Sequence, residues 1–189
     1  IKIGTWGRNI MYSAVLMGFF LGQVRLGART QSERSWQEAS VLALCHSYDE
    51  ALPYYVSLKH RFEDNPYFLY NYAAVFTEAK EYEKALKVAL ECRKYWADYD
   101  LELLLGDIYR EKKDYKQAEE YYMSASYMCP SRFLPLYQLY ELYKCIGNTE
   151  KASELAKILL EKPAKVNSAL IKRIRYMVKK DGLINSAPR

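Results

Sequence analysis

Apolar side chains recur with the period of a helix through most of this chain. Leu69, Tyr72, Ala73 and Phe76 stand at positions i, i+3, i+4 and i+7, which places them on one face of a helix. The pattern itself repeats, because a small residue returns in the same local context after 34, 33 and 34 residues. These small residues are Ala51, Ala85, Ala118 and Ala152. This internal period predicts a tandem array of helical hairpins.

The stretch from Leu105 to Pro130 shows the repeat most completely, and it resembles the tetratricopeptide (TPR) pattern. Gly106 and Ala118 are small where two helices are expected to cross closely. Tyr109 and Tyr122 are predicted to fill the space between those helices. Pro130 cannot continue the preceding helix and so ends the unit.

We therefore predict an all-α fold, a right-handed TPR superhelix (α-α solenoid) of about four helix-turn-helix repeats plus a C-terminal capping helix, preceded by an apolar N-terminal helix. The expected repeats are 32–65, 66–98, 99–132 and 133–165, within domains 1–31, 32–165 and 166–189. Ala39, Ala73 and Gly106 hold the small position of the first helix in three repeats. The fourth has Tyr140 there, which predicts a splayed or repacked helix pair.

Residues 10–22 are almost entirely apolar, and the interpretation we favour is the last transmembrane helix of a longer membrane protein, reaching residue 28. A signal peptide and a buried or amphipathic helix are the alternatives. Residues 23–31 are expected to form a short polar connection. Because the first residue is Ile1, we expect the sequence to be a fragment or a processed product.

The last expected helix covers residues 168–180, with Gly182 as its terminator. One stripe of this helix is apolar and the remainder is basic, which suits a cap on the array. A basic amphipathic helix is also drawn to anionic lipid, so contact with an anionic membrane surface is a second expectation.

Charge is distributed unevenly. Residues 1–34 carry five basic and one acidic side chain, residues 35–161 carry 15 and 21, and residues 162–189 carry eight and one. The acidic array makes nucleic acid an improbable partner. Four unpatterned cysteines and two histidines offer no metal-ligand spacing, and unpatterned thiols fit a reducing compartment. We expect no cofactor, no metal and no catalytic site in this segment.

Function is therefore expected on the concave surface, which the first helix of each repeat lines. The predicted groove is a site for a protein or peptide partner, with tyrosines as anchors. The alternative is a structural or oligomerising extension whose groove holds no ligand. The predicted groove residues are Tyr67, Tyr70, Asn71, Ala74, Leu103, Asp107, Arg110, Tyr137, Gln138, Glu141 and Lys144.

Several junctions between the repeats add a family resemblance. These are Asn65-Pro66-Tyr-Phe-Leu69, Asp98-Tyr-Asp100, Cys129-Pro130-Ser-Arg132-Phe133 and Lys162-Pro163-Ala-Lys165-Val166. Over residues 30–182 the chain resembles the C-terminal TPR region of O-antigen ligase/polymerase-like membrane proteins of Bacteroides-type bacteria. That resemblance implies a role in surface polysaccharide ligation or polymerisation at the bacterial inner membrane, with the catalytic residues outside this segment. Three arginines after the apolar stretch favour a cytoplasmic array over a periplasmic one.

Overall fold

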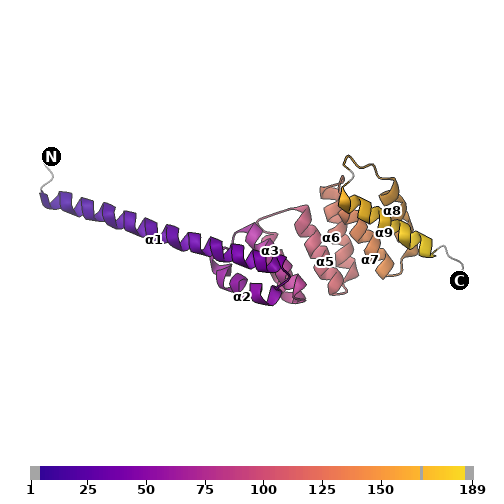
Figure 1. Ribbon diagram of the computed structural model, residues 1–189, viewed down its shortest axis with the longest axis horizontal. Helices are drawn as coiled ribbons and strands as arrows, with labels where there is room; N and C mark the ends of the chain where they lie inside the picture. Colours follow the sequence, from indigo (N-terminus) through magenta and orange to yellow (C-terminus); the bar gives the residue numbers. More distant parts are fainter. Residues whose placement is uncertain (1–4, 167, 186–189) are drawn as a thin grey trace. The chain divides into compact units, whose positions relative to one another are not determined.

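The computed structural model describes residues 5–166 and 168–185, and the side chains of residues 5–12, 14, 28 and 183–185 lie outside the description. Within these ranges every regular element is helical (Figure 1). The elements are α1 Thr5–Leu44, α2 Tyr48–Leu58, the 3-10 turn η1 Lys59–Arg61, α3 Pro66–Glu78, α4 Tyr82–Cys92, α5 Tyr99–Glu111, α6 Tyr115–Met128, α7 Leu134–Cys145, α8 Thr149–Glu161 and α9 Ala169–Asn185.

The chain divides into two compact units, Ile1–Glu63 and Asp64–Arg189. In the first unit, α2 packs against the C-terminal part of α1. Trp36 lies 5.3 Å from Phe62 between ring centroids, and the Ser40 and Tyr55 hydroxyls are 3.4 Å apart. Ala39 and Ala51 are fully buried, so the small residues of the repeat allow these two helices to approach closely.

Residues 23–31 do not form the expected connection, because α1 runs through them as one helix of 40 residues. Polar side chains alone do not stop a helix, and this segment contains no proline. Arg29 pairs with Glu33 at 3.0 Å, and the Thr30 hydroxyl donates to the Leu26 carbonyl at 2.9 Å. The Arg29–Glu33 pair is an i, i+4 side-chain pair, which supports the helix where we expected it to break.

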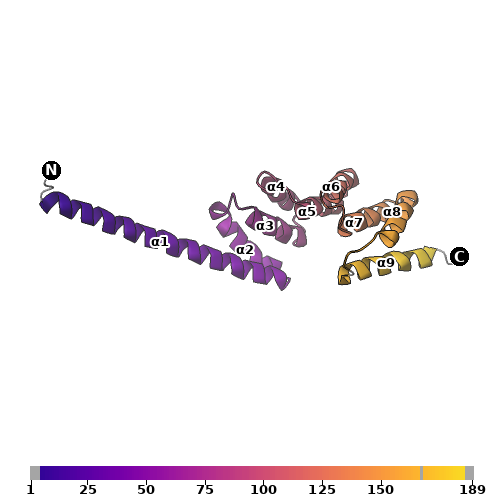
Figure 2. The ribbon, with the colours of Figure 1, turned by 90° about the horizontal axis from the view of Figure 1, so that it is seen from above.

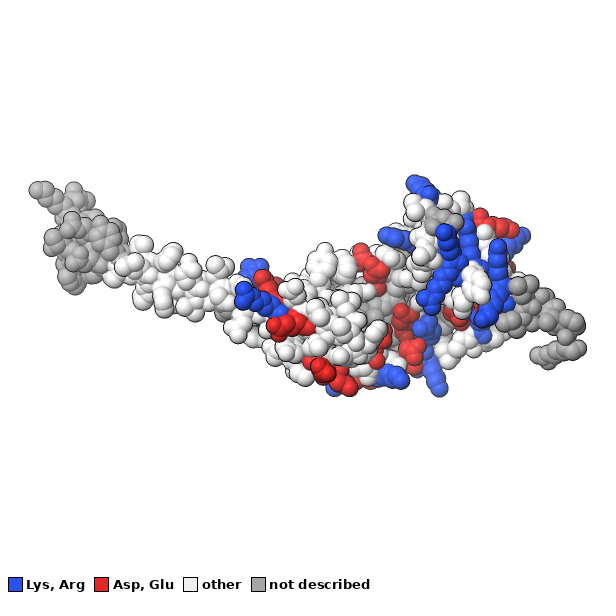
Figure 3. Space-filling view, viewed as in Figure 1, with Lys and Arg blue, Asp and Glu red and all other residues white. Residues whose placement is uncertain are grey.

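The apolar stretch of α1 is exposed in this structure. Phe19, Phe20 and Leu26 are each 60–68% exposed, and the space-filling view shows a long uncharged surface here (Figure 3). Among the residues that the structure describes, no helix combines the length and the apolar character needed to cross a bilayer. The side chains of residues 10–12, 14 and 28 lie outside the description, so the transmembrane helix expected over residues 10–28 stays a prediction.

In the second unit, α3, α5 and α7 form one layer, and α4, α6 and α8 form the other (Figure 2). Each pair α3–α4, α5–α6 and α7–α8 is a helical hairpin, and α9 lies alongside the last of them. Side-chain caps begin several of the helices: Asn65 accepts from the Phe68 amide at 3.1 Å, and Asn148 accepts from the Lys151 amide at 3.1 Å.

The turns within the hairpins share one backbone feature. His46, Lys80, Lys113 and Gly147 each have a φ between 61° and 74°, and they are 34, 33 and 34 residues apart. A left-handed residue ends a helix and lets the chain reverse. The same turn geometry therefore recurs with the period that the sequence predicts.

The crossing between α5 and α6 confirms the role predicted for Gly106. A Cβ atom at this position would lie 2.4 Å from Cε1 of Tyr122, a side chain that is fully buried. Ala85 and Ala118 are also fully buried. In the fourth hairpin Tyr140 is buried and its hydroxyl donates to Asp181 of α9 at 2.9 Å, so this larger side chain reaches the terminal helix.

Two predicted helix ends were wrong. The repeat pattern predicts a helix over residues 82–96 in the second repeat, but this helix ends at Cys92, and the Tyr95 amide then donates to the Cys92 carbonyl in an i, i−3 turn. The last helix continues beyond Gly182 to Asn185. One glycine costs a helix roughly 1 kcal/mol, which does not suffice to end it.

Candidate functional site

The layer formed by α3, α5 and α7 carries an aromatic cluster at its α3 end. The Trp96 ring lies 5.3 Å from Tyr67 and meets Tyr70 edge-to-face at 5.7 Å. Because the chain leaves its helix at Cys92, Trp96 folds back onto α3. Tyr67 is 63% exposed. The cluster therefore offers aromatic surface in a geometry that π-systems favour.

A polar network joins α5, α6 and α7 beside this cluster. Asp107 accepts hydrogen bonds from the Tyr122 hydroxyl at 2.6 Å and from Nε2 of Gln138 at 3.3 Å. Nη1 of Arg110 donates to Oε1 of Gln138 at 3.2 Å, and the Arg110 guanidinium lies 3.6 Å from Asp107. The side chains of Asp107 and Arg110 remain 30% and 27% exposed, so a ligand can reach both of them.

Burial dominates the electrostatics of the network. It raises the pKa of Asp107 above its ordinary value, although the Tyr122 hydrogen bond and the Arg110 charge act in the opposite direction. Burial also raises the pKa of Tyr122, as does the neighbouring Asp107 carboxylate. For Arg110, burial lowers the pKa, but Tyr122, Asp107 and Glu111 outweigh it and the net direction is upward.

Tyr70 links the aromatic cluster to this network. Burial first, and then the charges of Asp100 and Asp107, raise the pKa of Tyr70 to about 12. Burial is the larger cause, and the two carboxylates add a negative potential at Tyr70 that further disfavours the phenolate. This part of the surface is therefore suited to a cationic group placed against aromatic rings.

The far end of the layer is occupied by the chain itself. Lys144 of α7 pairs with Glu141 at 3.4 Å and with Asp181 of α9. The Asp181 carboxylate also accepts from Tyr140, and these two partners hold its pKa below the ordinary value although burial acts in the opposite direction. The C-terminal helix thus occupies part of the surface that we predicted for a partner.

The structure brings most of the predicted groove residues together, in two groups. Tyr67 and Tyr70 join the aromatic cluster. The other contacts connect Asp107, Arg110 and Gln138, pair Glu141 with Lys144, and place Tyr137 6.1 Å from Tyr140. Asn71 and Ala74 are half-buried on α3.

Leu103 does not belong to this surface. It is 5% exposed and packs in the core with Ala118 and Tyr122, because α5 is enclosed by its neighbouring helices. Sequence reasoning in turn missed Trp96 and Asp181. The aromatic side chain at the end of the second repeat was a usable signal for Trp96, whereas nothing local marks Asp181.

The described residues provide little for metal or nucleophile chemistry. Within them, no group of three or more His, Cys, Asp or Glu side chains could hold a metal ion. Cys92 is fully buried, its thiol donates to the Pro66 carbonyl at 3.2 Å, and burial raises its pKa to about 11. The thiol is therefore protonated near neutral pH, and such a thiol is a poor nucleophile.

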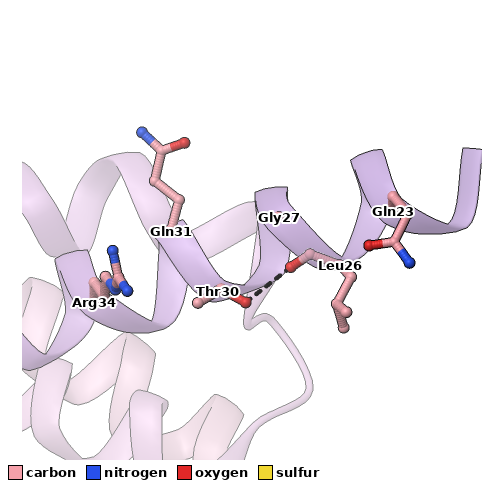
Figure 4. A pocket seen from close by; sticks show the side chains of 6 residues that line it. All are labelled: Gln23, Leu26, Gly27, Thr30, Gln31 and Arg34. Carbon is pink, nitrogen blue, oxygen red and sulfur yellow. Dashed lines mark hydrogen bonds between the residues drawn. The ribbon is translucent and has the colours of Figure 1, made fainter. Parts of the chain in front are cut away.

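A depression of about 550 Å³ also lies on α1 (Figure 4). Every lining residue comes from this one helix. The lining residues are Gln23, Leu26, Gly27, Thr30, Gln31 and Arg34. One face of a single helix does not enclose a ligand, and this depression enters no functional proposal.

Together, the paired helical layers and the polar and aromatic surface define a TPR-type helical scaffold. No protein-family model matches the chain, and no curated protein matches it. Solved structures share its fold. MamA 41-end from Desulfovibrio magneticus RS-1 superposes with a TM-score of 0.64 at 18% identity, covering 77% of this chain and 76% of that chain. A MamA RS-1 ArsTM double mutant gives 0.63 at 19%, covering 90% and 93%. At such identities the likeness concerns the fold.

Proposed function

We propose that this chain is a protein-interaction scaffold that binds a cationic peptide segment on the layer formed by α3, α5 and α7. The observation that carries the proposal is the meeting of two groups on one surface. The Asp107 network presents a carboxylate that is 30% exposed, and the Tyr67–Tyr70–Trp96 cluster is close enough for Tyr70 to sense the Asp107 charge.

A lysine or arginine side chain satisfies both groups. Its charge pairs with Asp107, whose burial makes an added cation more valuable than it would be in water. Its position over Tyr70 or Trp96 adds a cation–π contribution, on the order of 0.5–2 kcal/mol. Helices of this fold supply a rigid surface, so little ordering of the scaffold is needed on binding.

Selection from a random peptide library on the full chain tests this proposal. We expect the selected peptides to be rich in lysine and arginine, and Asp107→Asn to weaken them about tenfold or more. Asn keeps an oxygen that accepts from Tyr122, so the fold is preserved. Glu154→Gln removes an equal charge from an exposed position on α8 and serves as the matched control. Peptides of unbiased composition, or equal affinity for both variants, would refute the proposal.

The second candidate is a structural extension that holds no ligand. It is favoured by the hydrogen bonds that Asp107, Arg110 and Gln138 already make with one another. On this reading, Asp107→Asn lowers the unfolding midpoint and changes no interaction of the protein in cells. Comparing the stability and the co-purifying partners of the same variant separates the two candidates.

A narrower proposal rests on the residue likeness to O-antigen ligase-like proteins. In it the scaffold serves surface polysaccharide assembly from the cytoplasmic face of a bacterial inner membrane. It is attached there through residues 10–28, and the basic face of α9 touches anionic lipid. Membrane fractionation of the full chain, together with a variant that carries serines at the exposed Phe19 and Phe20, tests the attachment. The attachment predicts that the wild-type chain stays with the membrane and the serine variant is released. If both proteins stay with the membrane, or both appear in the soluble fraction, the result would count against the attachment.

A further inference from the structure

A recess lies in the second unit, where the connection between α8 and α9 meets the turn between α6 and α7. Its volume is about 750 Å³. It is bounded by Tyr99 at the start of α5, by the turn between α6 and α7, by described residues of the connection between α8 and α9, and by the first turn of α9. The Arg132 guanidinium lies 5.5 Å from the centre of the Tyr99 ring. The lining residues used below are Arg132, Phe133, Lys162, Ala164, Lys165 and Leu170. A recess of this size accommodates a small ligand or a few side chains of a peptide.

The walls of the recess are held in place by contacts within the chain. The ammonium of Lys162 donates to the Pro130 carbonyl at 2.5 Å and lies 5.6 Å from the Phe133 ring. Arg175 of α9 donates to the Lys162 carbonyl at 2.5 Å, and its guanidinium lies over the Phe133 ring, 5.4 Å from the ring centroid. Lys162, at the start of the connection between α8 and α9, is therefore held against the turn between α6 and α7.

The rim is cationic. Arg132, Lys162 and Lys165 line it, and within residues 5–166 and 168–185 no carboxylate forms an ion pair with any of the three. The wider surface has the same sign, because lysine and arginine side chains gather over α9 (Figure 3). Apolar side chains make up much of the lining: Phe133 is buried at 4% exposed, and Leu170 is 49% exposed at the edge.

We propose that this recess is a second binding site, which takes an acidic peptide segment carrying one bulky apolar side chain. The apolar side chain enters the recess beside Phe133 and Ala164, and flanking carboxylates pair with Arg132 and Lys165. Charge complementarity selects this occupant: three cations without carboxylate partners surround one apolar hollow. Its lining shares no residue with the groove proposed above, and its charge is opposite in sign.

A bilayer fits these features less well than a peptide. Membrane-binding surfaces insert side chains that protrude. Val166 and Leu170 of the lining are 74% and 49% exposed, but Phe133 is only 4% exposed and cannot enter a bilayer. A peptide can place one side chain into such a hollow, and a flat lipid surface cannot. Binding to anionic vesicles is therefore the alternative outcome of the test.

Fluorescence anisotropy with the full chain measures the interaction. The probes are short labelled peptides with one central phenylalanine, leucine or tryptophan flanked by aspartates, and matched peptides with asparagines in place of the aspartates. We expect at least one acidic peptide to bind in the micromolar range. The double variant Arg132→Gln/Lys165→Gln should weaken it about tenfold or more, and Ala164→Trp, which fills the recess, should abolish binding.

Two controls separate site loss from general effects. Lys172→Gln/Lys179→Gln removes two charges from exposed positions of α9 outside the lining, and should change the affinity by no more than about twofold. Tyr70→Ala, which affects the proposed groove, should leave the acidic peptide bound. Thermal melts followed by circular dichroism establish that each variant is folded.

Three results would overturn the proposal. One is the absence of micromolar binding by every acidic peptide, and another is equal affinity for the asparagine peptides. The third is binding to phosphatidylserine-containing vesicles but not to peptides, with a dependence on Lys172 and Lys179 instead of Arg132 and Lys165.

Discussion

Replacing Gly106 with alanine tests the packing argument at the centre of the second unit. The added Cβ would lie 2.4 Å from Cε1 and 2.5 Å from Cδ1 of Tyr122. Ordinary carbon–carbon contacts are about 3.5–4.0 Å, so the ring must move by roughly 1 Å or more. Tyr122 has little room to move, because it is fully buried and its hydroxyl is bonded to Asp107 at 2.6 Å.

The size of the effect follows from three contributions. Overpacking a core costs about 1–3 kcal/mol, and losing a hydrogen bond to a charged group costs about 1.5–3 kcal/mol. Alanine favours the helix over glycine by about 1 kcal/mol, which offsets part of the loss. We therefore expect Gly106→Ala to destabilise the protein by about 2–4 kcal/mol, a large part of a typical stability of about 5–15 kcal/mol.

Urea unfolding followed by far-UV circular dichroism measures this change. Gly182→Ala is the matched control, because a Cβ at this position in α9 would have no atom within 4 Å. It should leave the stability unchanged or raise it. In a Tyr122→Ala background the Gly106→Ala substitution should lose most of its effect. Wild-type stability of Gly106→Ala, or an undiminished effect in the Tyr122→Ala background, would refute the reasoning.

Three other predictions concern buried or strained groups. Arg93→Ala should destabilise the protein by about 2 kcal/mol or more in urea unfolding, because it leaves the Glu102 carboxylate, only 2–3% exposed, without its partner at 2.9 Å. The loss should be smaller than for a fully buried pair, since Arg93 is 46% exposed. Adding Glu102→Leu should recover part of the stability, and a further decrease would contradict this account. Burial raises the pKa of Cys92 to about 11 and that of Tyr70 to about 12, so the folded state holds these protons more tightly than the unfolded state. The free energy of unfolding should therefore be at its full value at about pH 8 and fall as the pH rises from about 9 through the two folded pKa values. A urea midpoint at about pH 10.5 that is unchanged or higher would contradict this prediction. Gly147→Ala should lower the unfolding midpoint by an amount equivalent to about 1 kcal/mol, because the φ of 74° disfavours a Cβ, and a neutral result would show that the turn relaxes.

The helical hairpins were predictable because their determinants are local. Gly106 and Ala118 stand where two helices cross, and the repeat spacing identifies both from the sequence. Asn65 before Pro66 begins a helix by a rule that needs no tertiary information. The turn at Gly147 is equally local.

The features that were not predicted from the sequence depend on contacts between residues far apart in the chain. Asp181 meets Tyr140 across 41 positions, and no periodicity indicates that pairing. Leu103 has the residue type and position of a groove residue, yet it lies in the core because the neighbouring helices cover it. The recess around Phe133 likewise forms only when two loops and a helix start come together.

The continuity of α1 has a mechanical consequence. A helix rises 1.5 Å per residue, so Val15 stands roughly 36 Å along the axis from Ala39, where α2 is packed. A flexible linker would let a partner bound at the apolar end sample many distances from the hairpin, whereas a continuous helix fixes that distance. A partner bound to the exposed apolar turns of α1 would therefore be held at a fixed distance from the α1–α2 hairpin. A torque or force applied to those turns would be transmitted along the helix to the hairpin.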